Sequence, residues 1–112
     1  MRNGTAERRE NPRTDLSCPV SLYNRAGELI ARAKTVNVSD GGMLVSIPVS
    51  ALPKLEDRAN VALSVPRSTP TTYMLEDFAC AARVVRHQPM VDDAFAGVAL
   101  AFDEPQDLCL EV

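Results

Sequence analysis

Short runs in which every second residue is apolar are the sequence feature that most constrains the fold. In "MLVSI" the apolar residues Met43, Val45 and Ile47 alternate with other positions, and "VALSV" and "AGVALAF" repeat the pattern. Successive side chains of a β-strand point to opposite faces, so this period predicts strands with one buried face. We therefore expect a sheet that covers an apolar core.

Turn-forming residues separate these runs. "CPVSLYN" and "GELIARAKTVNVS" flank a polar stretch, residues 24–27, that ends in glycine and predicts a hairpin loop. "PVSALPKLEDRAN" contains two prolines and predicts a turn of helix or an irregular crossover. "YMLEDFACAARVVRH" fits a helical face and a strand face equally well; its "RVV" end and its neighbours favour a long strand. "PQDLCLEV" predicts a short last helix that begins at Pro105.

The order of these elements indicates an all-β fold. The chain has 112 residues, enough for one small domain. About six short strands without a regular alternation of strands and helices predict a small antiparallel β-barrel, closed or nearly closed, with a short C-terminal helix. We assign residues 15–112 to this barrel and residues 1–14 to a flexible N-terminal arm.

Several protein classes are disfavoured by composition. No run approaches the roughly 18 apolar residues that cross a bilayer, and the N-terminus is polar, so we predict a cytoplasmic protein without membrane insertion. The three cysteines (Cys18, Cys80 and Cys109) are far apart and form no CxxC pair, which argues against a disulfide framework and a zinc site. We expect buried, reduced thiols and no metal.

Charge is unevenly distributed along the chain. Residues 1–13 carry four arginines and two glutamates, a net charge of +2; since the whole chain carries −3, the remainder carries −5. A basic arm on an acidic body is poorly suited to long DNA or RNA, whose binding requires the neutralisation of many phosphates. The distribution suits a small anion held at one place.

Two motifs stand out. Arg9 and Arg13 form an RxxxR in the arm, and Asn37, Ser39 and Gly42 form an NxSxxG within "NVSDGG". Alone, the second motif would indicate a turn between strands. Together, in this order and on a predicted small barrel, the motifs resemble those of the PilZ domain, the bacterial receptor module for cyclic di-GMP.

The resemblance also covers "RVVRH" and "AGVALAF", which look like the end of the PilZ barrel. It implies a six-stranded antiparallel split barrel with a C-terminal helix, no catalytic activity and no cofactor. It further implies that cyclic di-GMP binds where the arm crosses the barrel surface.

The chemistry of each motif residue suits this ligand. Arginine presents a planar fork that binds a phosphate, pairs with guanine or stacks on a base, so Arg9 and Arg13 fit both halves of the ligand. Asn37 offers an amide to a guanine edge, and Ser39 offers a hydroxyl and a backbone group. Gly42, which lacks Cβ, would allow a close approach of the ligand to the backbone.

Arg8 immediately precedes RxxxR, a position that in the family influences whether one or two ligand molecules stack. A cation there could cap a second guanine, or it could be a solvated arm residue; both interpretations stay open. The predicted function is a stand-alone adaptor whose arm changes conformation on binding and is recognised by a downstream effector protein. The alternative is a PilZ-like protein-interaction adaptor that does not bind the nucleotide.

Other function classes have weaker support. The chain has one histidine, His87, and no GxSxG or P-loop pattern, so we predict no enzymatic activity and no catalytic residues. An oligonucleotide-binding barrel is a rival fold-level interpretation. Such barrels stack bases on aromatic side chains, however, and only two tyrosines and three phenylalanines are present here.

Overall fold

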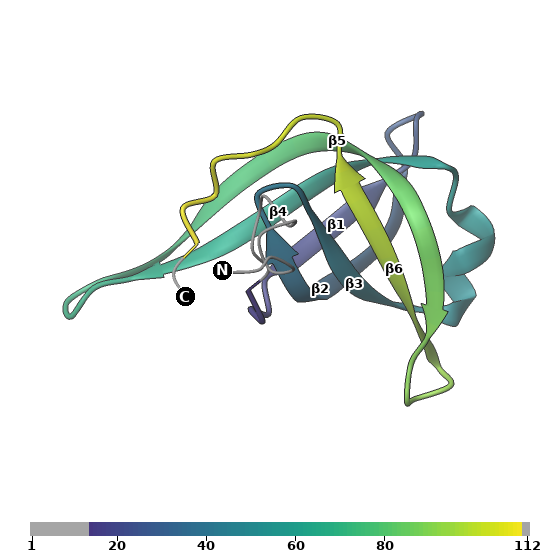
Figure 1. The fold of residues 1–112 in the computed structure, drawn as a ribbon, viewed down its shortest axis with the longest axis horizontal. Helices are drawn as coiled ribbons and strands as arrows, with labels where there is room; N and C mark the ends of the chain where they lie inside the picture. Colours follow the sequence, from purple (N-terminus) through teal and green to yellow (C-terminus); the bar gives the residue numbers. More distant parts are fainter. Residues whose placement is uncertain (1–13, 111–112) are drawn as a thin grey trace, which may run out of the picture.

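The computed structural model describes residues 14–110, which form six β-strands and one short 3-10 helix (Figure 1). In chain order the elements are β1 (Pro19–Tyr23), β2 (Leu29–Ser39), β3 (Gly42–Pro48), η2 (Val49–Lys54), β4 (Arg58–Ser68), β5 (Tyr73–Pro89) and β6 (Phe95–Phe102).

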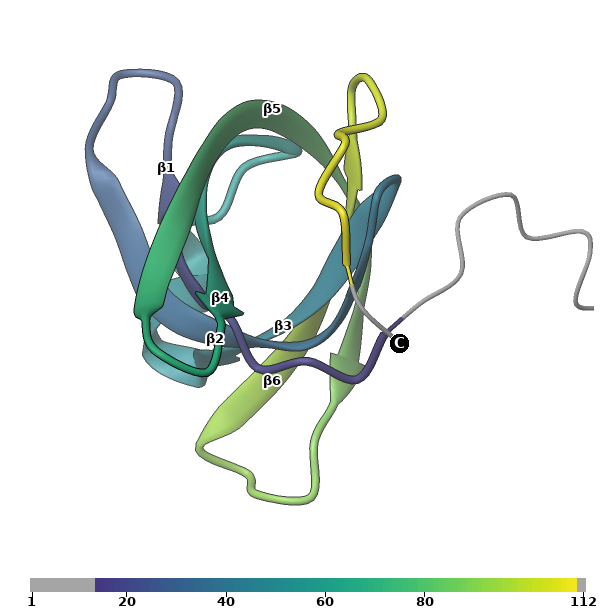
Figure 2. The same cartoon turned by 90° about the vertical axis from the view of Figure 1, so that its left-hand side faces the viewer.

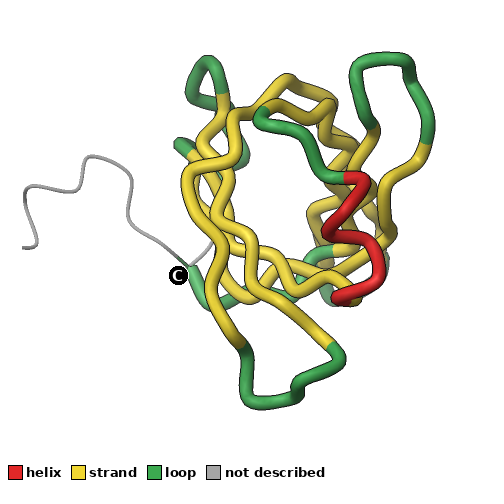
Figure 3. The backbone as a smooth tube through the Cα atoms, turned by 90° about the vertical axis from the view of Figure 1, so that its right-hand side faces the viewer, coloured by secondary structure: helices red, strands yellow, loops and turns green. Residues whose placement is uncertain are grey.

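The six strands form one sheet that closes on itself in the order β1-β2-β3-β6-β5-β4. Every neighbouring pair is antiparallel. Figure 2 and Figure 3 show the ring from its two ends. The predicted six-stranded antiparallel barrel is therefore confirmed. Closure gives each strand two hydrogen-bonded neighbours along part of its length, which removes most open edges.

Alternating residues of the strands fill the interior. Leu22, Val45, Leu63 and Val98 are completely or almost completely buried, as the two-residue period predicts. The core is mostly aliphatic, and its members from outside the strands include Leu108, which lies beyond β6 and is 0% exposed. Leu108 therefore anchors the segment after β6 to the packed core.

The β1–β2 hairpin has the predicted loop. The Gly27 N–H donates to the Asn24 carbonyl at 2.9 Å, and the Glu28 N–H donates to the Asn24 side-chain oxygen at 2.9 Å. Gly27 has a φ of 87°, a left-handed conformation that glycine adopts at little cost. The left-handed backbone conformation of this loop therefore explains why glycine is favoured at position 27.

The segment whose periodicity was ambiguous is a single long strand, β5. Each residue from Tyr73 to Arg83 pairs with a residue of β4, and the later part of β5 pairs with β6. Together β4 and β5 form a hairpin whose end projects beyond the barrel (Figure 1). Cross-strand pairing, rather than local propensity, decides the conformation here.

The predicted C-terminal helix from Pro105 is wrong for the described residues, because residues 103–110 contain no helix. The one helix between residues 14 and 110 is η2, which follows β3 and is red in Figure 3. Two backbone groups that a helix would use are bound elsewhere: the Leu108 N–H donates to Asp40 and the Leu108 carbonyl accepts from Arg67. Tertiary contacts have replaced helical hydrogen bonds.

The cysteine prediction is only partly correct. All three thiols are free, but Cys18 is buried, Cys80 is half-buried and Cys109 is exposed. Burial raises the pKa of the Cys18 and Cys80 thiols. Between residues 14 and 110 no group of side chains is arranged to hold a metal ion. No helix in that range has the length and apolar character that crossing a membrane requires.

Candidate functional site

The NxSxxG residues lie together where β2 ends and β3 begins. Asn37 and Ser39 lie at the end of β2, and Gly42 is the first residue of β3. Ser39 pairs directly with Gly42. Asp40 and Gly41 form the two-residue turn between them. We refer to residues 39–42 as the motif turn.

A β-bulge orients the first two motif residues. The register between β2 and β3 shifts between Thr35 and Asn37, so Val36 is an extra residue on β2. Thr35 is buried opposite Val45, and Val38 is buried opposite Met43. Because neighbours alternate between faces, Asn37 and Ser39 share the face that points away from the core.

The Ser39 hydroxyl is engaged within the motif turn. It accepts a hydrogen bond from the Gly41 N–H at 3.2 Å and lies 3.4 Å from the Gly42 carbonyl oxygen, to which it donates. The residue is only 6% exposed. The hydroxyl thus stabilises the turn, a local role typical of serine next to a tight turn.

Gly42 is required by the fold itself. A Cβ atom at this position would lie 2.3 Å from the Leu100 carbonyl oxygen and 3.2 Å from Ala101 Cα, both in the neighbouring strand β6. No side chain fits at such distances without a shift of backbone. The structure thus gives this glycine a role inside the barrel, in addition to the ligand approach that the family resemblance implies.

Asn37 has an unusual hydrogen-bonding state. Its side-chain oxygen Oδ1 is buried and has no hydrogen-bond partner among residues 14–110. Leaving a buried acceptor unpaired costs about 1–3 kcal/mol, so such atoms are uncommon in folded proteins. A donor group of a ligand placed at this position would remove the penalty.

The start of the described chain is attached to the motif strand. Thr14 pairs with Val38, the residue between Asn37 and Ser39: the Thr14 N–H donates to the Val38 carbonyl at 2.8 Å, and the Val38 N–H donates to the Thr14 carbonyl at 3.0 Å. Arg8, Arg9 and Arg13 lie outside the described residues. Their connection to the barrel therefore begins at the motif strand.

Thr35 binds the segment that follows Thr14, at Leu16 and Cys18. This residue was not identified from the sequence. Its Oγ1 accepts from the Cys18 N–H at 2.8 Å and donates to the Leu16 carbonyl. Its own N–H donates to the Cys18 carbonyl at 3.0 Å. Thr35 is 4% exposed, and a single polar residue in an otherwise apolar inward row is the signal that could have identified it.

The segment after β6 also contacts the motif turn. The Gln106 N–H donates to the Asp40 carbonyl at 2.7 Å, and the Leu108 N–H donates to the Asp40 carboxylate at 3.1 Å. The Phe102 N–H donates to the Gly41 carbonyl at 2.9 Å. The end of the described chain, yellow in Figure 2, thus contacts the motif turn, and the start of the described chain pairs with β2 at the residue before this turn.

The class that this fold and site define is a small closed β-barrel domain whose N-terminal segment pairs with a glycine-bearing hairpin. A family model described as the PilZ domain matches residues 7–110, which is most of the chain. The protein belongs to the PilZ domain family. A search of curated proteins found no match.

Solved structures show the same fold. The inhibitor of motility MotI/DgrA of Bacillus subtilis is similar with a TM-score of 0.69 and 18% identity, over 88% of this chain and 44% of that chain. The Borreliella burgdorferi PlzA protein in complex with c-di-GMP gives 0.61 and 10%, over 89% and 46%. The PilZ domain of YcgR from Escherichia coli, with c-di-GMP, gives 0.57 and 14%, over 87% and 79%.

The present chain therefore spans less than half of the first two of these proteins. At such identities the likeness defines the barrel architecture, and the residues of the site must be argued from this chain itself.

Proposed function

We propose that this protein is a non-catalytic receptor that binds cyclic di-GMP through Arg9, Arg13, Asn37, Ser39 and Gly42. The observation that carries the proposal is the pairing of Thr14 with Val38. It attaches the segment that bears RxxxR to the strand that bears the NxSxxG residues, as a shared site requires. The family membership and the c-di-GMP in two structures of similar fold support the choice of ligand.

The described part of the site suits a guanine base. The unpaired Oδ1 of Asn37 is an acceptor, and the Watson–Crick edge of guanine carries N–H donors. The two arginines would supply forks for the phosphates and for the Hoogsteen edge of guanine. Neutral acceptors from the barrel and cations from the arm together match a ligand that has both donors and negative charge.

The proposed signal is a rearrangement of residues 1–13 around the ligand, which a downstream effector protein then recognises. Fixing the backbone of a residue costs about 1–2 kcal/mol, whereas micromolar binding corresponds to about −8 kcal/mol. Ordering the arm therefore consumes a large part of the contact energy. Arg8 is proposed to influence how many ligand molecules bind, by stacking on a second guanine.

Calorimetric titration with cyclic di-GMP tests the proposal. We expect binding to the wild type that Arg9→Ala and Arg13→Ala each weaken at least about tenfold, because each loses charge-assisted hydrogen bonds. Arg25→Ala is a matched control, since Arg25 is an exposed arginine in the β1–β2 loop, at the other end of β2 from the motif turn. Absence of binding to the wild type would instead support the adaptor that works by protein contact alone.

A further inference from the structure

We infer that residues 103–110, here called the C-terminal strap, position the motif turn for ligand binding, and that Arg67 is the residue that clamps this strap. The inference rests on the proposed function, because it concerns the affinity of the same site. Arg67 lies in β4, outside both sequence motifs.

The first support is the way in which the motif turn is held. Asp40 uses both its carbonyl and its carboxylate to bind the strap, at Gln106 and Leu108. Neither bond is made within the hairpin, so the strap contributes contacts that the hairpin cannot supply. Pairing with β6 holds Gly41 and Gly42, and the strap adds the contacts that hold Asp40, the remaining residue of the turn itself.

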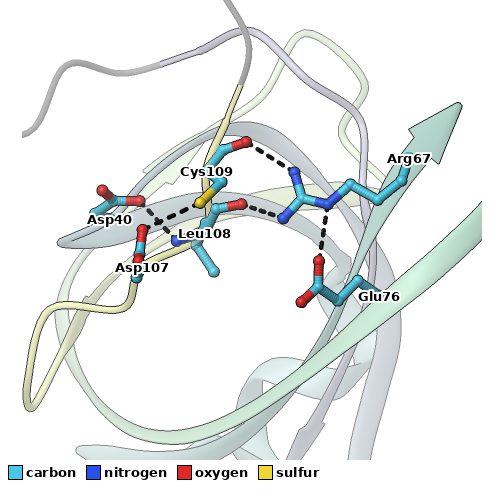
Figure 4. A network of polar contacts seen from close by, with 6 residues as sticks. All are labelled: Asp40, Arg67, Glu76, Asp107, Leu108 and Cys109. Carbon is cyan, nitrogen blue, oxygen red and sulfur yellow. Dashed lines mark hydrogen bonds and ion pairs between the residues drawn. The ribbon is translucent and has the colours of Figure 1, made fainter. Parts of the chain in front are cut away.

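The second support is the clamp, which Figure 4 shows. The Arg67 guanidinium donates to the carbonyls of two consecutive strap residues: Nη1 to Cys109 at 2.8 Å, and Nη2 to Leu108. Its Nε donates to the Glu76 carboxylate at 3.0 Å, which orients the fork. A planar fork can hold two acceptors at once, whereas the point charge of a lysine cannot match this geometry.

The third support is the apolar anchor of the strap. Leu108 is 0% exposed and belongs to the barrel core, although it lies outside every strand. The next residue, Cys109, has a φ of 53°, a conformation that non-glycine residues seldom adopt without surrounding contacts. The strap is thus held at one residue by packing, by Arg67 and by Asp40 together.

These contacts make strap docking and turn geometry parts of one equilibrium. If only the docked state presents the motif turn correctly, the observed dissociation constant equals the intrinsic constant divided by the docked fraction. Reciprocity then requires that the ligand increases docking by the same factor by which docking increases affinity. Loss of the clamp should therefore weaken ligand binding, and ligand binding should increase docking of the strap.

The first measurement is calorimetric titration of cyclic di-GMP into Arg67→Gln, with Glu76→Gln as the matched control. Both variants lose the Arg67–Glu76 ion pair, but only Arg67→Gln loses the contacts to the strap carbonyls. We expect about tenfold weaker binding in Arg67→Gln, which is about 1.4 kcal/mol, and a change of less than about twofold in Glu76→Gln. Equal affinities in all three proteins, or tighter binding in Arg67→Gln, would overturn the inference.

The second measurement uses the wild type, and so does not depend on how a variant folds. Amide hydrogen exchange at Gln106 and Leu108 is followed with and without cyclic di-GMP. We expect slower exchange with ligand at these two amides, which bind Asp40. Unchanged or faster exchange alongside measurable binding would refute the role of the strap alone. A wild type that binds no cyclic di-GMP would overturn the proposed function, and this inference with it.

Discussion

Thr14 and Val38 exchange two backbone hydrogen bonds, of 2.8 and 3.0 Å, at the one point of β2 that lies between Asn37 and Ser39. The residue that follows RxxxR in the chain is thereby joined to the strand that bears Asn37 and Ser39. The N-terminal segment enters the fold beside the residues with which it is proposed to act. No long excursion of the chain is needed to bring the two motifs to one ligand.

The anchoring of the N-terminal segment by Thr35 can be tested by urea unfolding of Thr35→Val. This change keeps the shape of the side chain but removes the acceptor for the Cys18 N–H and the donor to the Leu16 carbonyl. We expect a loss of about 1–3 kcal/mol in the free energy of unfolding, because a buried N–H is left unpaired. Thr35→Ser keeps the hydroxyl and should lose less; equal losses in both variants would show that the hydroxyl is unimportant.

Gly42→Ala should destabilise the protein before any ligand is considered. The new Cβ would lie 2.3 Å from the Leu100 carbonyl oxygen, so β3 and β6 must move apart. We expect a loss of about 1–3 kcal/mol or more in thermal or urea unfolding. Ser46→Ala, on the same strand, serves as the control and should change stability by less than about 0.5 kcal/mol. Normal stability in Gly42→Ala would contradict the close approach of the two strands.

Asn37→Asp should alter stability and affinity in opposite directions. A carboxylate at the buried Oδ1 position, which lacks a partner among the described residues, should destabilise the free protein. The same carboxylate would accept charge-assisted hydrogen bonds from guanine, so we expect cyclic di-GMP to bind up to about tenfold more tightly. Thermal unfolding and calorimetry measure the two effects. Weaker binding than in the wild type would argue that Asn37 donates to the ligand instead.

The exposed thiol of Cys109 provides a pH-dependent prediction. Its Sγ donates to the Asp107 carboxylate at 3.2 Å, and this hydrogen bond, together with the charge of Asp107, raises the pKa of the thiol. Replacement of Asp107 by Asn removes the negative charge, lowers the pKa and increases the thiolate fraction at pH 8. Alkylation of Cys109 by iodoacetamide, followed by mass spectrometry, should become several-fold faster. An unchanged rate would show that Asp107 does not control this thiol.

Much of the barrel was predictable from local patterns. The two-residue period identified β3, β4 and β6 as strands, and the polar stretch that ends in Gly27 identified the β1–β2 loop. The expected single buried face is seen in β4, whereas residues 96–100 of β6 are buried on both faces of the sheet. The composition of the motif turn predicted the tight turn between β2 and β3, and its resemblance to a family motif led to the proposed site. These strands and turns depend on residues that are close together in the chain, so the sequence alone determines them.

Other features depended on contacts between distant segments. The bulge at Val36, the pairing of Thr14 with Val38 and the approach of β6 that requires Gly42 become visible only when strands are placed in register. The last segment was predicted as a helix, yet burial of Leu108 and the Arg67 clamp hold it in another conformation. Sequence patterns determined which residues form strands and turns. Tertiary structure decided which groups form hydrogen bonds with the backbone at Thr14 and in residues 103–110, because long-range packing outweighs local propensity there.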